Sequence, residues 1–510
     1  MPKVVVLDFG SQYTQLIARK VREMGVFSEI FPFSIRLSRV KKENPDAIIL
    51  SGGPQSVYGK NAPRFPRDVF EMGVPVLGVC YGLQLMSHLL GGKVVPTEKR
   101  EYGFASLKIK DSKGLLSGIK DDSQVWMSHG DRVEKVPPGF VVTGGTAHCA
   151  VAVMEEREKK LFGVQFHPEV VHTEQGKKIL SNFLFSIAEL KPAWKMGSFI
   201  ERKVEEIQQE VGKEKVVCGL SGGVDSLVTS LIVQKAISNR LFCIFVDNGL
   251  LRKGQYRELM EKFRKKLALN VVGVDASRRF LEALSGVSFP ERKRKIIGRT
   301  FIRIFEEEAA KIGDVGFLAQ GTIYPDVIES NPVRGPSDSI KSHHNVGGLP
   351  SRMKFKLIEP LRELFKDEVR ALAGELGVDR DFILQHPFPG PGLAVRIVGE
   401  VTPDRVRLLQ EADAILIDEI KKARLYHRLW QAFVVLLPVK AVGVMGDRRT
   451  YQSVVVIRLV QSVDGMTADW FPADSKLLSR VSNRIVNEVD GVNRVVYDIT
   501  SKPPGTIEWE

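Results

Sequence analysis

The sequence predicts an α/β protein that contains two doubly wound, mostly parallel sheet domains and a smaller α+β C-terminal domain. Apolar strand-like runs alternate with amphipathic helical stretches from the first residues onward, and the alternation restarts once along the chain. A chain of 510 residues is also too long for one ordinary hydrophobic core. We therefore expect domains over residues 1–190, 191–385 and 386–510.

The first domain opens with three apolar runs that have the composition of buried strands, and a segment with helical periodicity lies between two of them. A polar and basic interval, Glu189–Gly197, ends this half of the chain. The strands are expected at Val4–Leu7, Ala47–Leu50 and Val74–Val79, and the helix at Thr14–Met24.

The second domain repeats this rhythm until a cluster of proline and glycine, His386–Gly392, which predicts a boundary or a loop. Helices are expected at Phe199–Val211 and from Asp225, and strands at Lys215–Gly219 and Leu241–Val246.

The last region mixes one long helical segment, Pro403–Arg424, with strand-like runs at Ser453–Val460 and Arg494–Ile499. It contains the apolar run Ala432–Val439 and no complete catalytic motif of its own. We expect it to form a homodimer interface and to complete a nucleotide site; the alternative is a small third core.

The composition is that of a soluble globular protein, with 43% hydrophobic and 26% charged residues. We find no apolar run of membrane-spanning length and no signal-peptide pattern at the N-terminus. The four cysteines form no Cys-x-x-Cys pair, which argues against a disulfide scaffold and against zinc. A reducing, cytoplasmic location and no membrane partner are therefore expected.

The net charge of +13 fits nucleic acid, anionic small molecules or basic assembly patches as partners. The basic residues are spread along the chain, so a nucleic-acid partner would rest on charge alone and is not expected. The densest run is Glu291–Lys295. We interpret it as a solvated face, with a phosphate site as the alternative.

The first chemical motif is Gly78-Val-Cys80-Tyr-Gly82, which joins an apolar strand to an apolar helix. Small residues on both sides allow a sharp turn that projects the cysteine, and a helix N-terminus favours its reactive thiolate. An ordinary buried cysteine, as assumed for Cys218 and Cys243, is the alternative. The two glycines favour a nucleophile.

A general base for this cysteine is available in Gly163–Glu169. His167 and Glu169 are two residues apart and, in an extended segment, point to the same side. His167 is positioned to accept the thiol proton, and Glu169 to orient the imidazole. The turn Ser51-Gly-Gly-Pro54 offers backbone N–H groups for an oxyanion.

These three motifs, in this order, resemble the class I glutamine amidotransferase family over about residues 1–190. The resemblance implies that Cys80 forms a glutamyl thioester and that ammonia is released. It also implies that the amides of Gly53 and Tyr81 stabilise the oxyanion and that Gln84 helps to hold glutamine.

The second chemical motif is Gly219–Ser226, a glycine-rich loop between a strand and a helix, which suits an anion. It lacks the Gly-Lys-Ser/Thr of a Walker A loop and resembles the loop of N-type ATP pyrophosphatases. That resemblance implies cleavage of ATP between its α and β phosphates, with Asp225 as a Mg²⁺ ligand. Phe245–Gly249 follows the next strand, where such a sheet receives adenosine. The expected ATP-binding residues are Ser221, Gly222, Gly223, Val224, Asp225, Ser226 and Val246.

Four further segments, Gln320–Ser330, Lys341–Pro350, His386–Gly392 and Lys502–Glu510, resemble the glutamine-hydrolysing GMP synthetases, as does the domain order. The resemblance covers essentially the whole chain. It implies that xanthosine 5′-monophosphate (XMP) is adenylated on its C2 oxygen and then aminated, giving GMP, AMP, pyrophosphate and glutamate. It also points to XMP contacts from Arg294, Gln431, Arg494, Lys502, Ile507 and Glu508, and to a lid that contains Lys341, His343 and His344.

Three rival classes fit the sequence less well. Asparagine synthetase needs an N-terminal cysteine, which Met1-Pro2 excludes. A tRNA-modifying thiolase shares the glycine-rich loop but needs no Cys80 module. A non-catalytic nucleic-acid-binding protein would show strongly salt-dependent RNA binding.

Overall fold

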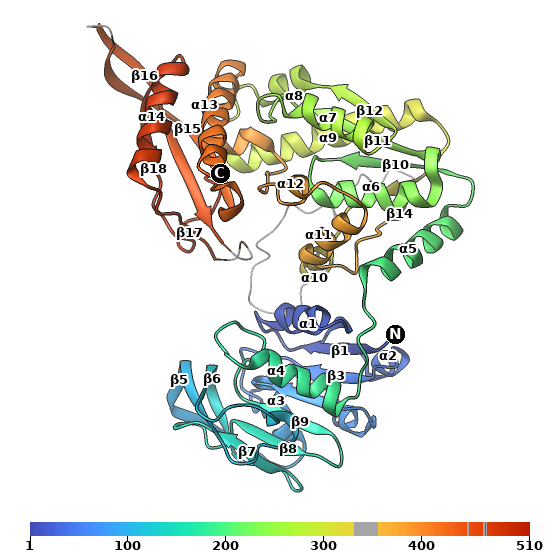
Figure 1. Ribbon diagram of the computed structural model, residues 1–510. Coiled ribbons are helices and arrows are strands. Elements are labelled where there is room, and N and C mark those ends of the chain that lie inside the picture. The colour runs from blue at the N-terminus through green and yellow to red at the C-terminus, as the bar shows by residue number, and fades with distance from the viewer. Residues whose placement is uncertain (331–354, 446–447, 463–464, 466) are drawn as a thin grey trace. The chain divides into compact units, whose positions relative to one another are not determined.

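A computed structural model of the protein describes residues 1–330, 355–445, 448–462, 465 and 467–510. The chain forms two compact units (Figure 1), of which the first contains Met1–Phe199 and the second contains Ile200–Val327 and the residues after 354. The residues of the predicted lid, Lys341, His343 and His344, lie outside the described residues.

The first unit is built on a nine-stranded sheet of order β2-β1-β3-β4-β9-β8-β7-β5-β6. Its first five strands are parallel, as predicted, and the other four continue the sheet in antiparallel pairs. The parallel strands are β2 (Phe27–Pro32), β1 (Lys3–Asp8), β3 (Ala47–Leu50), β4 (Val76–Val79) and β9 (Leu161–Val164). The antiparallel strands are β8 (Val153–Glu156), β7 (Val141–Gly145), β5 (Lys93–Ile109) and β6 (Ser123–Lys135).

Helix α1 buries one apolar stripe, whereas α3 is buried over most of its length. In α1, Ile17, Ala18 and Val21 are fully buried at helical spacing. One core cluster unites buried residues of β1, β3, β4 and α3. The helical segments are α1 (Thr14–Glu23), α2 (Leu37–Lys42), η1 (Arg67–Glu71), α3 (Tyr81–Leu89), η2 (Gly114–Leu116), α4 (Gly176–Ser181) and η3 (Asn182–Ile187).

The second unit contains an all-parallel sheet of order β12-β11-β10-β13-β14. Its strands are β10 (Lys215–Leu220), β11 (Leu241–Asp247), β12 (Val271–Asp275), β13 (Val315–Ala319) and β14 (Lys356–Ile358). Its helical segments are α5 (Met196–Val211), which begins in the first unit, α6 (Val224–Ile237), η4 (Ser238–Arg240), α7 (Gln255–Glu261), η5 (Lys262–Lys266), α8 (Ser277–Leu284), α9 (Pro290–Ile312), α10 (Tyr324–Ser330), α11 (Lys366–Glu375) and α12 (Arg380–Ile383).

The last part of the chain adds a smaller sheet, in which β16 pairs with β15 and β17 in antiparallel fashion and with β18 in parallel. A single hydrophobic cluster contains Val217 and Ile244 of the parallel sheet together with Leu409 and Ile457 of this part. This shared core is why three sheets make two compact units. The elements are η6 (Gly392–Arg396), α13 (Pro403–Lys422), η7 (Tyr426–Arg428), β15 (Gln431–Met445), β16 (Arg448–Gln461), β17 (Asp469–Trp470), α14 (Ser475–Glu488) and β18 (Val492–Tyr497).

The predicted α/β fold class is confirmed: a sheet with a parallel half in the first unit, an all-parallel sheet in the second and a smaller C-terminal sheet are present. Within the described residues, no helix combines the length and apolarity that crossing a bilayer requires.

Candidate active sites

Cys80 lies at the junction of β4 and α3 with φ +52° and ψ −104°, a backbone conformation that side chains rarely adopt. The flanking glycines make this turn possible. A Cβ atom on Gly78 would lie 2.6 Å from the backbone of Gly82, and one on Gly82 would collide with the carbonyl of Leu50. The N–H of Cys80 donates to the carbonyl oxygen of Val164 on β9, at 2.8 Å. The strained turn is therefore fixed by backbone contacts on both sides.

His167 and Glu169 pair as the sequence indicates, with 2.7 Å between Nδ1 and Oε1, and both are buried. The predicted reason is wrong, because β9 ends at Val164 and the pair lies in a turn rather than an extended segment. The hydroxyl of Thr173 donates to the His167 carbonyl at 2.6 Å, which fixes this turn. Burial lowers the pKa of His167, but the Glu169 carboxylate and a hydrogen bond with Cys80 raise it, and the net pKa is well above its usual value.

The glycine turn after β3 lies against this pair. A Cβ atom on Gly52 would come within 3.1 Å of Cε1 of His167, and one on Gly53 within 3.2 Å of Cγ of Tyr81. The hydroxyl of Tyr81 donates to the Pro63 carbonyl at 2.6 Å, and burial raises the pKa of Tyr81 to about 12. Gly53 thus lies against the side chain of Tyr81, the residue that follows Cys80. Their oxyanion role stays a prediction.

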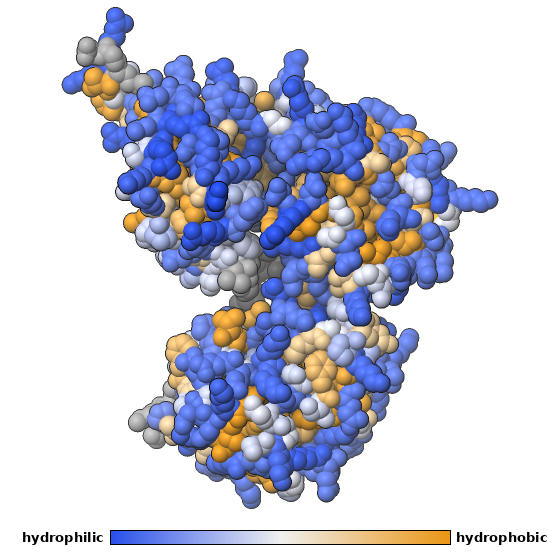
Figure 2. Space-filling model, viewed as in Figure 1, coloured by the Kyte–Doolittle hydropathy of each residue, from blue (hydrophilic) through white to orange (hydrophobic). Residues whose placement is uncertain are grey.

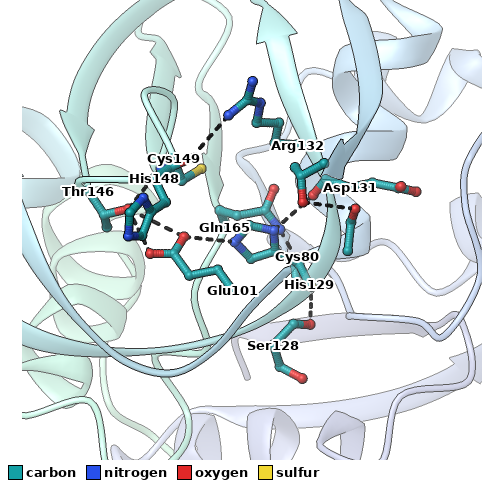
Figure 3. Close-up of polar contacts among 12 residues, drawn as sticks. Cys80, Glu101, Ser128, His129, Asp131, Arg132, Thr146, His148, Cys149 and Gln165 are labelled. Atoms are coloured by element: carbon teal, nitrogen blue, oxygen red, sulfur yellow. Dashed lines mark hydrogen bonds and ion pairs between the residues drawn. The ribbon is translucent and has the colours of Figure 1, made fainter. Parts of the chain in front are cut away.

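The predicted glutamine-binding residue Gln84 is buried and donates through Nε2 to the Asp131 carbonyl at 2.9 Å and to Oε1 of Gln165 at 3.2 Å. Gln165 in turn donates to Sγ of Cys80 at 3.6 Å, and Sγ lies 3.7 Å from the Ser128 carbonyl (Figure 3). Sequence reasoning missed Gln165, although it lies two residues before His167, and missed β6, which carries Ser128 and Asp131.

The glycine-rich loop follows β10 and leads into α6, as predicted. The N–H of Ser221 donates to Oγ of Ser226 at 3.1 Å, and the two hydroxyls lie 3.0 Å apart. Gly222 has φ +82°, which favours glycine, and Gly223 precedes the first helical residue, Val224. Val246 is buried at the end of the neighbouring β11. The six loop residues therefore form one hydrogen-bonded turn at the carboxyl end of the sheet.

Asp225 is the acidic residue of this loop, and its Oδ2 atom pairs with Nζ of Lys366 from α11. Its Oδ1 atom is buried and has no hydrogen-bond partner. Among the described residues, no group of three or more His, Cys, Asp or Glu side chains is arranged for a metal. Magnesium nevertheless fits, because it commonly uses one or two carboxylates together with substrate phosphates. Lys366 was missed because it is remote from Asp225 in sequence.

Comparisons with known proteins identify the domains that carry the two candidate sites. The family model "Glutamine amidotransferase class-I" matches residues 5–187, "NAD synthase" matches residues 195–292, and "GMP synthase C terminal domain" matches residues 418–509. The chain is 55% identical over 508 residues to a protein named GMP synthase (glutamine-hydrolyzing) from Brachyspira hyodysenteriae, covering 100% of this chain and 99% of that protein. The chain belongs to the family of glutamine-hydrolysing GMP synthases.

Another member, from Chlorobaculum tepidum, is 57% identical over 516 residues, with 100% of this chain and 99% of that protein covered. A solved structure of a glutamine amidotransferase from Thermotoga maritima covers 37% of this chain and 99% of its own at 18% identity, with a TM-score of 0.31.

For a GMP synthase, the residues predicted to contact XMP are of particular interest, and three of them come together. Nε2 of Gln431 donates to Oε1 of Glu508 at 2.7 Å, and the neighbouring Ile507 packs against Phe433 and its cluster. The buried Arg396 also binds Glu508 through two nitrogens, at 2.9 and 3.1 Å. Sequence reasoning did not single out Arg396.

Two other predicted XMP residues, Arg494 and Lys502, have different surroundings. Arg494 is exposed on β18, and Nζ of Lys502 donates to the Gly465 carbonyl at 2.7 Å. Within the described part of the chain, neither forms a hydrogen bond or ion pair with Gln431 or Glu508.

The basic run in α9 differs from the solvated face that we expected. Lys293 is fully buried, pairs with the carboxylate of Glu510 and donates to the Ile397 carbonyl at 2.6 Å. Arg294 binds the backbone carbonyl of Glu510. Burial lowers the pKa of Lys293 while Glu510 opposes that shift. The run thus anchors the C-terminal segment through Lys293 and Arg294.

Proposed function

We propose that this chain makes GMP from XMP, with glutamine as the ammonia source and ATP as the activating co-substrate. The proposal rests on sequence identities of 55% and 57%, over the full chain, to proteins named glutamine-hydrolysing GMP synthase. Two separate candidate active sites within one chain, one with a cysteine nucleophile and one with a phosphate-type loop, support it.

At the first site, His167 takes the thiol proton of Cys80, and Glu169 holds the imidazole by its hydrogen bond of 2.7 Å to Nδ1. The thiolate attacks the side-chain amide carbon of glutamine, and the N–H groups of Gly53 and Tyr81 bind the oxyanion. Ammonia leaves, and water then hydrolyses the glutamyl thioester to glutamate. The raised pKa of His167 suits it to keep this proton until the leaving nitrogen needs it.

At the second site, the loop from Ser221 to Ser226 binds the phosphates of ATP through its backbone N–H groups and the N-terminus of α6. Lys366 adds a positive charge beside the loop. Asp225, whose Oδ1 atom lacks a partner, is the residue to hold Mg²⁺, and the ion supplies neutralisation of phosphate charge. The C2 oxygen of XMP then displaces pyrophosphate from ATP, and ammonia displaces AMP.

The purine of XMP is assigned to the region of Gln431, Ile507 and Glu508, where amide and carboxylate groups lie beside apolar side chains. Arg494 and Lys502 are the cations proposed for its phosphate. Nη2 of Arg294 donates to the Glu510 carbonyl, so the other N–H groups of its guanidinium are the ones proposed to contact XMP.

We also infer a homodimer through the arm formed by residues 439–445 of β15 and 448–451 of β16. Val442 and Val444 are 51% and 72% exposed and lie two residues apart, hence on one face of the strand. Tyr451 pairs with Val442 across the arm and is 65% exposed. Figure 2 shows apolar surface on this arm. A second copy would remove it from water.

The dimer is tested by light scattering after size-exclusion chromatography. Wild type is expected at twice the chain mass, and Val444→Glu as a folded monomer. A monomeric, active wild type would exclude the dimer.

The activity is tested with purified protein, ATP, Mg²⁺ and XMP, using glutamine or ammonium as donor. We expect GMP and AMP from wild type with either donor, and from Cys80→Ala with ammonium only. If neither protein makes GMP, XMP is not the acceptor. Release of pyrophosphate from ATP with another acceptor would still support an ATP-dependent amidotransferase.

A further inference from the structure

A chain of hydrogen bonds leads from strand β6 to the sulfur of Cys80 (Figure 3). It starts at the Asp131 carbonyl oxygen, which can only accept. Gln84 must therefore present its NH₂ group there, at 2.9 Å. The second hydrogen of that group goes to Oε1 of Gln165, at 3.2 Å. Nε2 of Gln165 is then left facing Sγ of Cys80, at 3.6 Å.

The direction of this chain decides what the sulfur meets. If the Gln165 amide were reversed, a carbonyl oxygen would face the sulfur and disfavour a negative charge. An N–H group in that place favours the thiolate, which is the reactive form. The Ser128 carbonyl at 3.7 Å has the opposite preference, because it accepts the thiol hydrogen. Among these two neighbours, Gln165 is the one that favours ionisation.

His129 fixes the starting point of the chain. Its Nδ1 atom lies 2.9 Å from the same Asp131 carbonyl, so Nδ1 carries the hydrogen. Its Nε2 atom lies 3.3 Å from Oε2 of Glu101, the residue opposite His129 in the β5–β6 ladder. The Thr146 hydroxyl donates to Glu101 at 3.1 Å. Two buried donors, from Gln84 and His129, thus occupy both lone pairs of one carbonyl oxygen.

We propose that Gln165 is the N–H donor that stabilises the Cys80 thiolate, and that Gln84 and His129 are positioning residues that fix its orientation. The inference rests on the proposed function of Cys80 as the glutaminase nucleophile. In this scheme the thiol proton goes to His167, which Glu169 faces, and the charge left on sulfur is held by Gln165. Other ionisable groups interact with this site: His129 with His167 and with its partner Glu101, and Cys149 with Cys80.

The direct test is the rate at which iodoacetamide alkylates Cys80 in the full-length protein, between about pH 5 and about pH 10, where thiols ionise. The Cys80 peptide is quantified by mass spectrometry. In Gln165→Met, the profile is expected to move up by about one pH unit, so the rate near neutral pH falls about tenfold. Gln165→Glu keeps the side-chain size but places a carboxylate against the sulfur, and a larger loss is expected.

The matched control is Gln124→Met, because Gln124 lies on the same strand as Ser128 and donates to the His172 carbonyl at 3.2 Å. It should give the wild-type profile. Far-UV circular dichroism and thermal unfolding identify variants that fail to fold. A wild-type profile in either folded Gln165 variant would overturn the role of Gln165.

The positioning role of His129 has its own comparison. His129→Phe removes the donor to the Asp131 carbonyl and should slow alkylation near neutral pH about threefold, whereas His129→Asn keeps an N–H and should recover most of the rate. Equal rates for the two variants would remove His129 from the scheme. Alkylation needs neither ATP nor XMP, so its outcome is separate from whether wild type makes GMP.

Discussion

The two candidate active sites differ in how far their side chains are preorganised. Around Cys80 the reacting side chains are buried and already hydrogen-bonded to one another, as His167 is to Glu169. In the glycine-rich loop, Ser221 is exposed, the hydroxyls bond within the loop, and one oxygen of Asp225 has no partner. Covalent catalysis by side chains needs alignment before the substrate arrives, whereas a phosphate site can be completed by its ligand.

Among substitutions that test this difference between the two sites, Asp225→Asn is expected to have the largest effect on activity. Loss of the carboxylate removes the proposed Mg²⁺ ligand, so GMP formation should fall about 10³-fold with glutamine and with ammonium alike. Release of pyrophosphate from ATP in the presence of XMP is the measurement. Alkylation of Cys80 should stay at the wild-type rate. Loss of activity with glutamine alone would contradict the assignment of Asp225 to the ATP half.

Glu169→Gln should show the opposite selectivity. Without the carboxylate, the imidazole of His167 loses the charge that raises its pKa, and glutamine-dependent synthesis should fall about 10²-fold. Ammonium-dependent synthesis needs no glutaminase and should be retained. Steady-state rates with each donor give the answer, with Glu174→Gln as a control, since Glu174 is an exposed neighbour in sequence. Equal loss with both donors would mean that Glu169 supports the fold rather than the reaction.

Lys366→Met tests whether the loop site is completed by its ligand. Lys366 pairs with Asp225 and is proposed to contact phosphate, so its removal should raise KM for Mg²⁺-ATP about tenfold. The control Lys356→Met changes an exposed lysine on β14. Initial rates with ammonium, measured over a range of ATP concentrations, separate KM from kcat. An unchanged KM would place Lys366 outside the ATP site.

The smallest effect concerns the stability of the first unit and its dependence on pH. The folded-state pKa of His167 is raised above the unfolded value of about 6.5. Its contribution is therefore fully present below that value and is lost as the pH rises through the folded pKa. Near pH 6, the Tm of wild type should exceed that of Glu169→Gln by about 2–4 °C for each kcal/mol that the His167–Glu169 interaction contributes. This difference in Tm should become smaller near pH 9. A gap that widened at alkaline pH would contradict the raised pKa.

Much of the fold was predictable because its signals are local. Three such signals depend only on residues that are neighbours in sequence: the strand before the Cys80 turn, the glycines beside Cys80, and the glycine-rich loop that contains Asp225. The structure has each of them where the sequence indicated. The helix predicted at Pro403–Arg424 is found at Pro403–Lys422 because Thr402 caps its start, accepting from the N–H of Arg405 at 3.3 Å.

The rest was not predictable because it depends on which distant segments meet. Strand pairing places Glu101 opposite His129, and helix packing brings Lys366 to Asp225. Lys293 looked solvated in sequence because a basic run on a helix usually is, but Glu510 compensates its charge in the interior. Residues that contact XMP are the hardest to predict from the sequence, because such a site requires contacts from several elements at once.

The mixed sheet of the first unit has a consequence for how such a domain can diversify. Its parallel half carries the Cys80 turn, where collisions at Gly78 and Gly82 leave little freedom for substitution. Its antiparallel half carries β5 and β6, joined to the rest through β7. A lineage can therefore lengthen the β5–β6 hairpin or exchange its outer residues, while it inherits the nucleophile unchanged. Within that hairpin, Glu101, Ser128, His129 and Asp131 are the positions tied to Cys80 by the hydrogen-bond network, so the freedom to vary lies in the remaining residues.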